Sequence, residues 1–281
     1  MIVTIDGLTI RIPLANGRRV HAASDVSLRL QRGEVHAVIG ESGCGKSTIA
    51  QAMTGLLPRT AQVSGSVLYE GESLFGQEKR LLGRHIALIP QSTTTFLTPV
   101  RTVGDQLAET VHVLGGQRTP DELMEIVDLD PDALSLYPHE ISGGMAQRAA
   151  VAFALAGNPQ VIIADEPTAS LDPECTVGLL RLLRSIADCG AAIMLITHDI
   201  GALISTGIAD RLTVVYASRV VEQGAARDLL GGGAQSRYTR DLLAALPRNG
   251  LHRMPGAPPE LSDLPENYSY DERIVAGWET L

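Results

Sequence analysis

One short motif constrains this chain more than any other feature of its sequence. Residues 40–47 read Gly-Glu-Ser-Gly-Cys-Gly-Lys-Ser, the pattern G-x-x-x-x-G-K-S of a phosphate-binding loop. The mostly apolar run 35–39 suits a buried strand, and residues 48–53 begin a helix. Strand, glycine-rich turn and helix start are the context that the motif requires, so a chance glycine-rich turn is the weaker alternative. The motif predicts a parallel α/β core with an anion site at a strand end.

The chemistry of such a loop comes from its backbone and from two side chains. Glycines leave room for backbone N–H groups to face phosphate oxygens, and the helix N-terminus adds partial positive charge. Lys46 would reach the β- and γ-phosphates, and Ser47 would bind Mg²⁺. Cys44 is interpreted as a small tolerated side chain rather than as a nucleophile. The residues predicted to contact the phosphates are Gly40, Ser42, Gly43, Cys44, Gly45, Lys46, Ser47 and Thr48.

Two carboxylates end a second apolar run. Residues 161–164 are Val-Ile-Ile-Ala, and Asp165 and Glu166 follow directly. A buried parallel strand holds no charge along its length, but its carboxyl end opens onto the ligand crevice. We therefore expect Asp165 to hold Mg²⁺ and Glu166 to polarise the water that attacks the γ-phosphate. An ordinary strand with an acidic turn is the alternative, and the phosphate loop upstream makes it the weaker one.

Composition limits the class of protein. A length of 281 residues allows one large domain or two small ones, and 44% hydrophobic residues support a sizeable core. The net charge of −9 argues against nucleic acid as a partner, because nucleic acids are bound by basic surfaces. Three cysteines without a CxxC pair fit a reducing cytoplasm. We find no signal-peptide pattern and no apolar run near the roughly 18 residues that a membrane span needs, so any membrane role is expected to go through a partner.

Changes of pattern along the chain predict its organisation. Residues 2–12 and 20–30 alternate apolar and polar positions, which predicts two strands of an antiparallel layer joined at Asn16-Gly17. Helical periodicity follows from residue 102, with a last, alanine-rich helix expected over 146–156. The predicted parts are a nucleotide-binding core with the antiparallel layer (1–91 and 158–230), an inserted helical subdomain (92–157) and a C-terminal extension (231–281).

The segment before the alanine-rich helix carries a resemblance to a known family. Residues 141–145 read Ile-Ser-Gly-Gly-Met, which resembles the L-S-G-G-Q signature of ATP-binding cassette (ABC) ATPases. In isolation, a Ser-Gly-Gly helix cap explains the same residues. In the family, this loop binds the γ-phosphate held by the opposite subunit, which implies that role for Ser142, Gly143 and Gly144. A serine hydroxyl and glycine N–H groups at a helix start do form an anion site.

Other elements of the family occur in the family's order. Gln91 matches the Q-loop glutamine, which contacts metal and water and faces the transmembrane partner. Residues 170–172 match the D-loop at the dimer interface, and His198 matches the switch histidine that contacts the γ-phosphate. A lone histidine at a strand end is usually structural. The ordered set of motifs favours the functional interpretation and implies ATP and Mg²⁺ as ligands.

One expected element is missing. The position where the family commonly stacks adenine on an aromatic ring falls at Gly17, and residues 13–24 contain no Phe, Trp or Tyr. The candidates to replace that ring by cation–π or planar contact are Arg18, Arg19 and His21.

The flanks of the signature resemble one branch of the family, the oligopeptide, dipeptide and nickel importers. Tyr-Pro-His-Glu at 137–140 and Pro-Gly-Ala-Pro-Pro at 255–259 carry this resemblance. Many members hold an iron–sulfur cluster with cysteines near the C-terminus, where this chain has Tyr268 and Ile274, so no cluster is expected. The sequence leaves open whether this tail packs against a partner ATPase or is a disordered end.

The resemblance implies an ATP-hydrolysing importer subunit for peptides, nickel or metal chelates, peripheral on the cytoplasmic face of the cell membrane. Its implied partners are a second ATP-binding subunit (itself or a paralogue), two transmembrane permease subunits and, indirectly, an extracytoplasmic substrate-binding protein. A soluble ABC ATPase without a transport role is the alternative, although the chain shows no duplicated cassette, coiled-coil insertion or basic surface. A P-loop kinase for small molecules is a third, against which the signature loop and His198 argue.

Overall fold

A parallel sheet forms the centre of the molecule. The computed structural model describes residues 1–15, 17–92 and 96–278. Its larger sheet has the strand order β10-β9-β3-β8-β7-β6, parallel except for β10. These strands are β3 (Val35–Ile39), β6 (Ile86–Ile89), β7 (Val161–Asp165), β8 (Ala192–Ile196), β9 (Arg211–Tyr216) and β10 (Arg219–Ala225). Every residue of β3 and β8 is buried, which explains the continuous apolar sequence of β8 and, apart from His36, that of β3.

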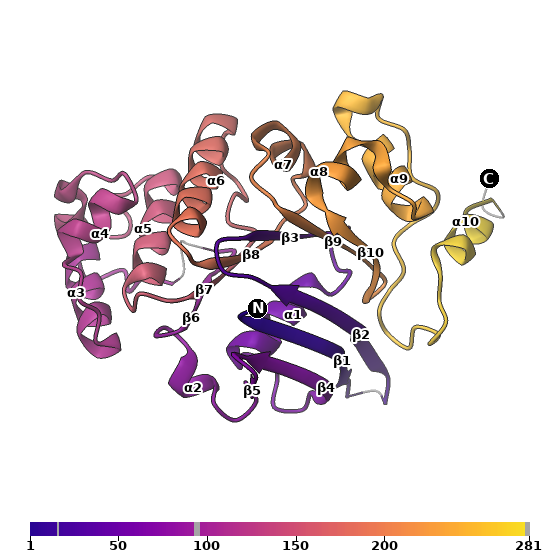
Figure 1. Cartoon of the computed structure of the whole chain (residues 1–281), viewed down its shortest axis with the longest axis horizontal. Helices are drawn as coiled ribbons and strands as arrows, with labels where there is room; N and C mark the ends of the chain where they lie inside the picture. Colours follow the sequence, from indigo (N-terminus) through magenta and orange to yellow (C-terminus); the bar gives the residue numbers. More distant parts are fainter. Residues whose placement is uncertain (16, 93–95, 279–281) are drawn as a thin grey trace.

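A smaller antiparallel sheet packs over the core, as the alternating sequence predicts (Figure 1). Its strands are β2 (Arg19–Leu30), β1 (Val3–Pro13), β4 (Gln62–Tyr69) and β5 (Glu72–Ser73), in that order. Helix α1 (Lys46–Thr54) buries Ile49 and Met53 in one cluster with residues of both sheets. The start of α1 is thereby fixed between the sheets. Asn16 of the predicted turn lies outside the described residues.

The chain between β6 and β7 folds mainly as helices, which lie together at one end of the molecule (Figure 1). They are α3 (Val103–Leu114), α4 (Pro120–Ile126), a 3₁₀ turn (Pro131–Ser135) and α5 (Gly143–Leu155). The alanine-rich helix was predicted to begin at residue 146, and this start is wrong. Helix α5 begins at Gly143 because the Ser142 hydroxyl accepts a hydrogen bond from the Met145 N–H (3.3 Å) and caps it.

The remaining helices cover the sheet and lead to the tail. They are α2 (Glu78–Leu81), α6 (Pro173–Asp188), α7 (Ile200–Thr206), α8 (Ala226–Asp228), a π turn (Leu229–Gly233), α9 (Arg237–Ala244), a 3₁₀ turn (Pro247–Asn249) and α10 (Tyr270–Trp278). Asp172 caps α6 by accepting from the N–H groups of Glu174 and Cys175, both at 2.9 Å. Within the described ranges, no helix is both long and apolar enough to cross a membrane.

Residues 250–278, here called the tail, pack against their own chain. Figure 1 shows the tail running from α9 past the ends of β2 and β10 to α10. Leu264, Tyr270 and Ile274 are buried in the main hydrophobic cluster. The Tyr270 ring lies edge-on to Tyr216 and Tyr238, with centroids 5.4 and 5.1 Å apart. The sequence suggested either packing against a partner ATPase or a disordered end, and the described part of the tail instead packs on its own chain. No sequence period indicated this packing, because the anchoring residues are far apart in the tail.

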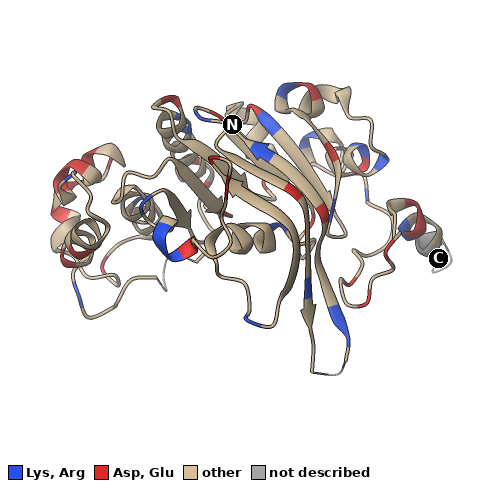
Figure 2. Ribbon diagram, turned by 60° about the horizontal axis from the view of Figure 1, so that its bottom comes forward, with Lys and Arg blue, Asp and Glu red and all other residues tan. Residues whose placement is uncertain are grey.

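Acidic residues concentrate away from the phosphate loop. Figure 2 shows red segments gathered on the helical end of the molecule. The acidic side chains that line one groove there are Asp121, Glu122, Glu125, Asp128 and Asp130. The net negative charge of the chain is therefore compatible with a site for an anionic ligand at the phosphate loop, which follows the interior strand β3.

A buried histidine in β3 makes stability depend on pH. His36 bonds to the Thr213 hydroxyl (2.7 Å) and to the Arg29 carbonyl (3.1 Å), and burial lowers its pKa from 6.5 to about 4. The unfolded chain therefore binds the proton first, and stability falls as the pH drops from about 6.5 to about 4. This histidine accounts for about 3 kcal/mol of the fall in the free energy of unfolding between pH 7 and pH 4. We expect that part of the fall to be absent in His36→Gln. Urea unfolding between pH 7 and 4 measures it, with the exposed His252→Gln as control. Equal pH slopes in wild type and His36→Gln would contradict the assignment.

Candidate nucleotide-binding site

The phosphate loop connects β3 to α1 in a conformation that requires two of its glycines. Gly40 has φ 154°, and a Cβ there would lie 2.2 Å from the Val215 carbonyl oxygen. Gly45 has φ 103°, and its Cβ would lie 2.2 Å from the Ala22 carbonyl oxygen. No side chain fits at either distance, so the G-x-x-x-x-G spacing reflects close contact with β9 and β2. The loop is thereby held at the N-terminus of α1.

Lys46 supplies a buried positive charge to this loop. Its side chain is 6% exposed, and Nζ donates to the carbonyl oxygens of Gly40 and Glu41, both at 2.9 Å. The ammonium group is therefore held over the loop, where the motif places a phosphate. Cys44 is buried beside it, and burial raises the pKa of the thiol. A raised thiol pKa disfavours the thiolate, which agrees with the interpretation of Cys44 as a small packing residue.

The first carboxylate lies beside the serine of the phosphate loop. Asp165 ends β7, and its Oδ1 accepts a hydrogen bond from the Ser47 hydroxyl at 3.1 Å. Burial raises the pKa of Asp165. Among the described residues, no cluster of three His, Cys, Asp or Glu side chains is placed to hold a metal. One carboxylate and one hydroxyl suit Mg²⁺, which in nucleotide sites takes its other ligands from phosphates and water.

The second carboxylate is held by the backbone and by a histidine. Glu166 is 8% exposed and has φ 49°, a left-handed conformation that costs energy for a side chain of this size. Its Oε2 accepts from the His198 backbone N–H (3.3 Å) and lies 2.8 Å from His198 Nδ1. The predicted Glu166 and His198 are thus in direct contact. Strain at this position is maintained because the backbone N–H of Glu166 also bonds to the Ile196 carbonyl in β8.

One cavity of about 300 Å³ joins several predicted residues from distant parts of the chain. Its polar lining consists of Ser42, Gly43, Gly45, Lys46, Ser47, Thr48, Gln91 and Glu166. The sequence did not identify the rest of the lining, which is Ile12, Val20, Ala22 and Leu261. Alternation along 2–12 and 20–30 places the first three on strands, but no local signal indicates Leu261.

The proposed replacements for the aromatic ring are placed elsewhere. Arg18 Nε donates to Asp263 at 2.9 Å, and Arg18 also pairs with Glu260 at 3.8 Å. The described residues that line the cavity do not include Arg18, Arg19 or His21. The prediction that Arg18, Arg19 or His21 contacts the base is therefore not supported. Arg18 instead pairs with acidic residues of the tail.

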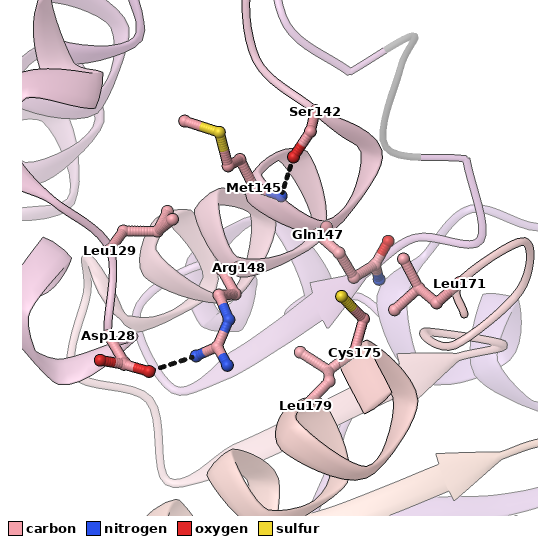
Figure 3. Close-up of a pocket in the computed structure, with 10 residues that line it drawn as sticks. Asp128, Leu129, Ser142, Met145, Gln147, Arg148, Leu171, Cys175 and Leu179 are labelled. Carbon is pink, nitrogen blue, oxygen red and sulfur yellow. Dashed lines mark hydrogen bonds and ion pairs between the residues drawn. The ribbon is translucent and has the colours of Figure 1, made fainter. Parts of the chain in front are cut away.

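The Ser-Gly-Gly segment lies outside this cavity. Ser142 and Gly144 line a separate hollow of about 200 Å³ with Leu171 and Cys175 (Figure 3). In Figure 3 the Ser142 and Met145 side chains lie at the same end of α5. Arg148 holds the opposite side by donating to the Val127 carbonyl (2.6 Å) and pairing with Asp128 (3.5 Å). Within one chain, the structure thus brings the phosphate loop, Gln91 and Glu166 together but leaves Ser142–Gly144 apart.

Comparison with known proteins agrees with this geometry. A family model described as ABC transporter matches residues 23–169. A probable peptide ABC transporter ATP-binding protein of Sinorhizobium fredii is 39% identical, covering 90% of this chain and 81% of that protein. The dipeptide transport ATP-binding protein DppD of Bacillus subtilis is 37% identical, covering 92% and 82%. The oligopeptide transport ATP-binding protein OppD of Mycobacterium tuberculosis is 40% identical over 89% of this chain, which spans only 44% of that relative.

Solved structures give the same fold. A dimeric ATP-binding cassette bound to ADP and Pi has a TM-score of 0.69 and 23% identity, covering 80% of this chain and 99% of that chain. An ATP-binding subunit of an ABC transporter has a TM-score of 0.67 and 25% identity, covering 99% and 100%. The predicted α/β cassette with its antiparallel layer is confirmed. The family model over half of the chain and relatives matched over most of their length show that this protein belongs to the ABC transporter family.

Proposed function

We propose that this chain is the ATP-hydrolysing subunit of an importer that takes up peptides across the cell membrane. The observation that supports it most is the single cavity that joins Lys46 and Ser47 to Gln91 and Glu166. A phosphate loop in one cavity with a buried carboxylate can both hold a nucleotide and activate a water molecule. Peptides are the favoured cargo because the relatives are named for oligopeptide and dipeptide transport. Nickel or a metal chelate is the alternative cargo.

The phosphates of ATP would lie on the loop. Lys46 Nζ, which now contacts the Gly40 and Glu41 carbonyls, would turn to the β- and γ-phosphates. Ser47 and Asp165 would hold Mg²⁺ with help from Gln91, and the ion would neutralise charge on the phosphates. The raised pKa of Asp165 falls again when a cation replaces solvent beside the carboxylate.

Hydrolysis would depend on Glu166 as the general base. Its carboxylate borders the cavity and is oriented by its bonds to His198. An oriented carboxylate can take the proton of a water molecule as that water attacks the γ-phosphate. The His198 side chain is 65% exposed, so its ring remains accessible to the γ-phosphate while Nδ1 bonds to Glu166.

The Ser-Gly-Gly segment would complete the site of a second subunit. Ser142, Gly143 and Gly144 lie at the N-terminus of α5, where Ser142 and Gly143 are exposed, and Ser142 and Gly144 line a hollow separate from the nucleotide cavity. Two cassettes packed head to tail would place this helix start against the γ-phosphate bound by the partner. ATP would thus join the two subunits, and hydrolysis would release them. The Met145 side chain leaves the backbone contacts available.

This switch would act on membrane proteins from the cytoplasmic side. Gln91 lies at the end of β6, where the chain enters the segment leading to α3. Movement of the helical part on ATP binding would be transmitted there to two permease subunits. The second cassette is either the same chain or a paralogue, and an extracytoplasmic protein would deliver the cargo.

Uptake in cells tests the proposal. Cells that lack the gene are complemented with wild type, Lys46→Ala or Lys79→Ala, and labelled dipeptide, oligopeptide and nickel uptake are measured. Lys46 and Lys79 are the only lysines of the sequence, and Lys79 is exposed on α2. We expect wild type and Lys79→Ala to restore peptide uptake, and Lys46→Ala to leave it at the level of the deletion. Restoration of nickel uptake alone would replace the cargo, and uptake that never depends on the gene would overturn the transport role.

A further inference from the structure

The tail extends the free edge of the smaller sheet and reaches the nucleotide cavity. The His21 N–H donates to the Leu261 carbonyl (2.8 Å), and the Asp263 N–H donates to the Arg19 carbonyl (2.7 Å). Val20 and Ser262 form an antiparallel bridge between these two bonds. The tail is thus paired with the start of β2, and Leu261 is one of the residues that line the cavity.

Three aliphatic residues border the cavity there. Ile12 of β1 is the register partner of Val20, which in turn bridges to the residue after Leu261. Paired strands lie about 5 Å apart, so the three residues line the cavity from adjacent backbones. We call Ile12, Val20 and Leu261 the aliphatic wall. All three are partly exposed, which leaves apolar surface open to the cavity.

The aliphatic wall adjoins the phosphate loop. A Cβ on Gly45 would touch the Ala22 carbonyl, and Ala22 is two residues along β2 from Val20. Two residues of a strand span about 7 Å. A nucleotide with its phosphates on the loop would find the aliphatic wall within reach of its base along β2.

The same tail is also attached to the phosphate loop itself. Arg273 of α10 is 3% exposed, and its two terminal nitrogens donate to the Glu41 carboxylate at 2.5 and 3.1 Å. Glu41 is the second residue of the loop. The Tyr238 hydroxyl accepts from the Glu41 N–H at 3.2 Å. Leu261 therefore belongs to a segment that is attached both to β2 and to the phosphate loop.

We propose that the tail supplies a nucleotide-binding residue, Leu261, which covers the purine base of ATP together with Ile12 and Val20. This inference rests on the proposed nucleotide site and assigns its missing base contact. Aliphatic groups cover the face of a base but do not read its polar edge. The site therefore binds GTP within a few-fold of ATP. An aromatic ring is not required, because the tail closes the place where the ring is missing.

Binding measurements on the full-length protein test this assignment. Calorimetry gives dissociation constants for Mg-ATP and, as a probe without a base, for inorganic tripolyphosphate. Leu261→Ala is expected to weaken ATP binding about 5- to 10-fold, in keeping with the loss of a half-buried leucine contact. Tripolyphosphate binding is expected to stay unchanged. Leu261→Met should restore ATP binding, because it keeps the apolar volume.

Leu251→Ala is the matched control, since Leu251 lies on the same tail but is 67% exposed and does not line the cavity. Equal ATP affinity in wild type and Leu261→Ala would overturn the assignment. Equal weakening of ATP and tripolyphosphate would also overturn it, because the effect would then be on the loop and not on the base. Wild type that binds neither compound would instead remove the proposed nucleotide site.

Discussion

Replacement of Glu166 by glutamine is expected to lower ATP hydrolysis about 10²- to 10⁴-fold, the contribution of a general base. The amide keeps the size of the side chain and can still bond to His198, but it cannot accept a proton from water. ATP binding should persist, because Lys46 and Ser47 are unchanged. Bound ATP that is not hydrolysed should therefore hold two cassettes together. Phosphate release and size-exclusion chromatography with Mg-ATP measure the two effects.

The controls separate the base from the shared site. Glu125→Gln, on the exposed surface of α4, should hydrolyse ATP at the wild-type rate. Ser142→Arg added to Glu166→Gln should prevent the ATP-dependent dimer, since a bulky side chain then occupies the helix start that is proposed to meet the partner's phosphate. If the second cassette is a paralogue, the dimer requires that protein. Wild-type turnover in Glu166→Gln would show that another group activates the water.

Replacement of Arg273 by alanine is expected to destabilise the fold by about 3–5 kcal/mol. The variant leaves the Glu41 carboxylate, 17% exposed, without the guanidinium that neutralises it. The Pro255 and Gly256 carbonyls also lose their donor at 2.7 and 3.2 Å. Urea unfolding followed by far-UV circular dichroism measures the change.

A double-mutant cycle shows whether the loss comes from the ion pair. Glu41→Gln with Arg273→Met removes both charges and should recover most of the stability lost in Arg273→Ala. Arg248→Ala removes an exposed arginine from the 3₁₀ turn before the tail and should change stability by less than about 0.5 kcal/mol. An Arg273→Ala variant as stable as Arg248→Ala would mean that the tail contributes no stability through Glu41.

The sequence predicted the elements whose signals are local. The run Val35–Ile39, the glycines after it and the helix start all lie within twenty residues, and the structure has each of them in place. Asp165 and Glu166 were found because two charges end an apolar strand. The helix start at Gly143 was missed, because a Ser-Gly-Gly cap carries little apolar periodicity and the cap itself is a hydrogen bond to Ser142.

The amino-acid sequence by itself therefore determined the phosphate loop, the core strands and the position of Asp165 and Glu166 at a strand end, because turn conformation and strand burial depend on neighbouring residues. Only the tertiary structure decided which residues close the cavity beside β2. Leu261 lines the same cavity as Ile12 and Val20, and Arg273 contacts Glu41, across more than 200 residues of sequence. Such contacts depend on where the whole sheet places the edge of β2, and no local pattern records that position.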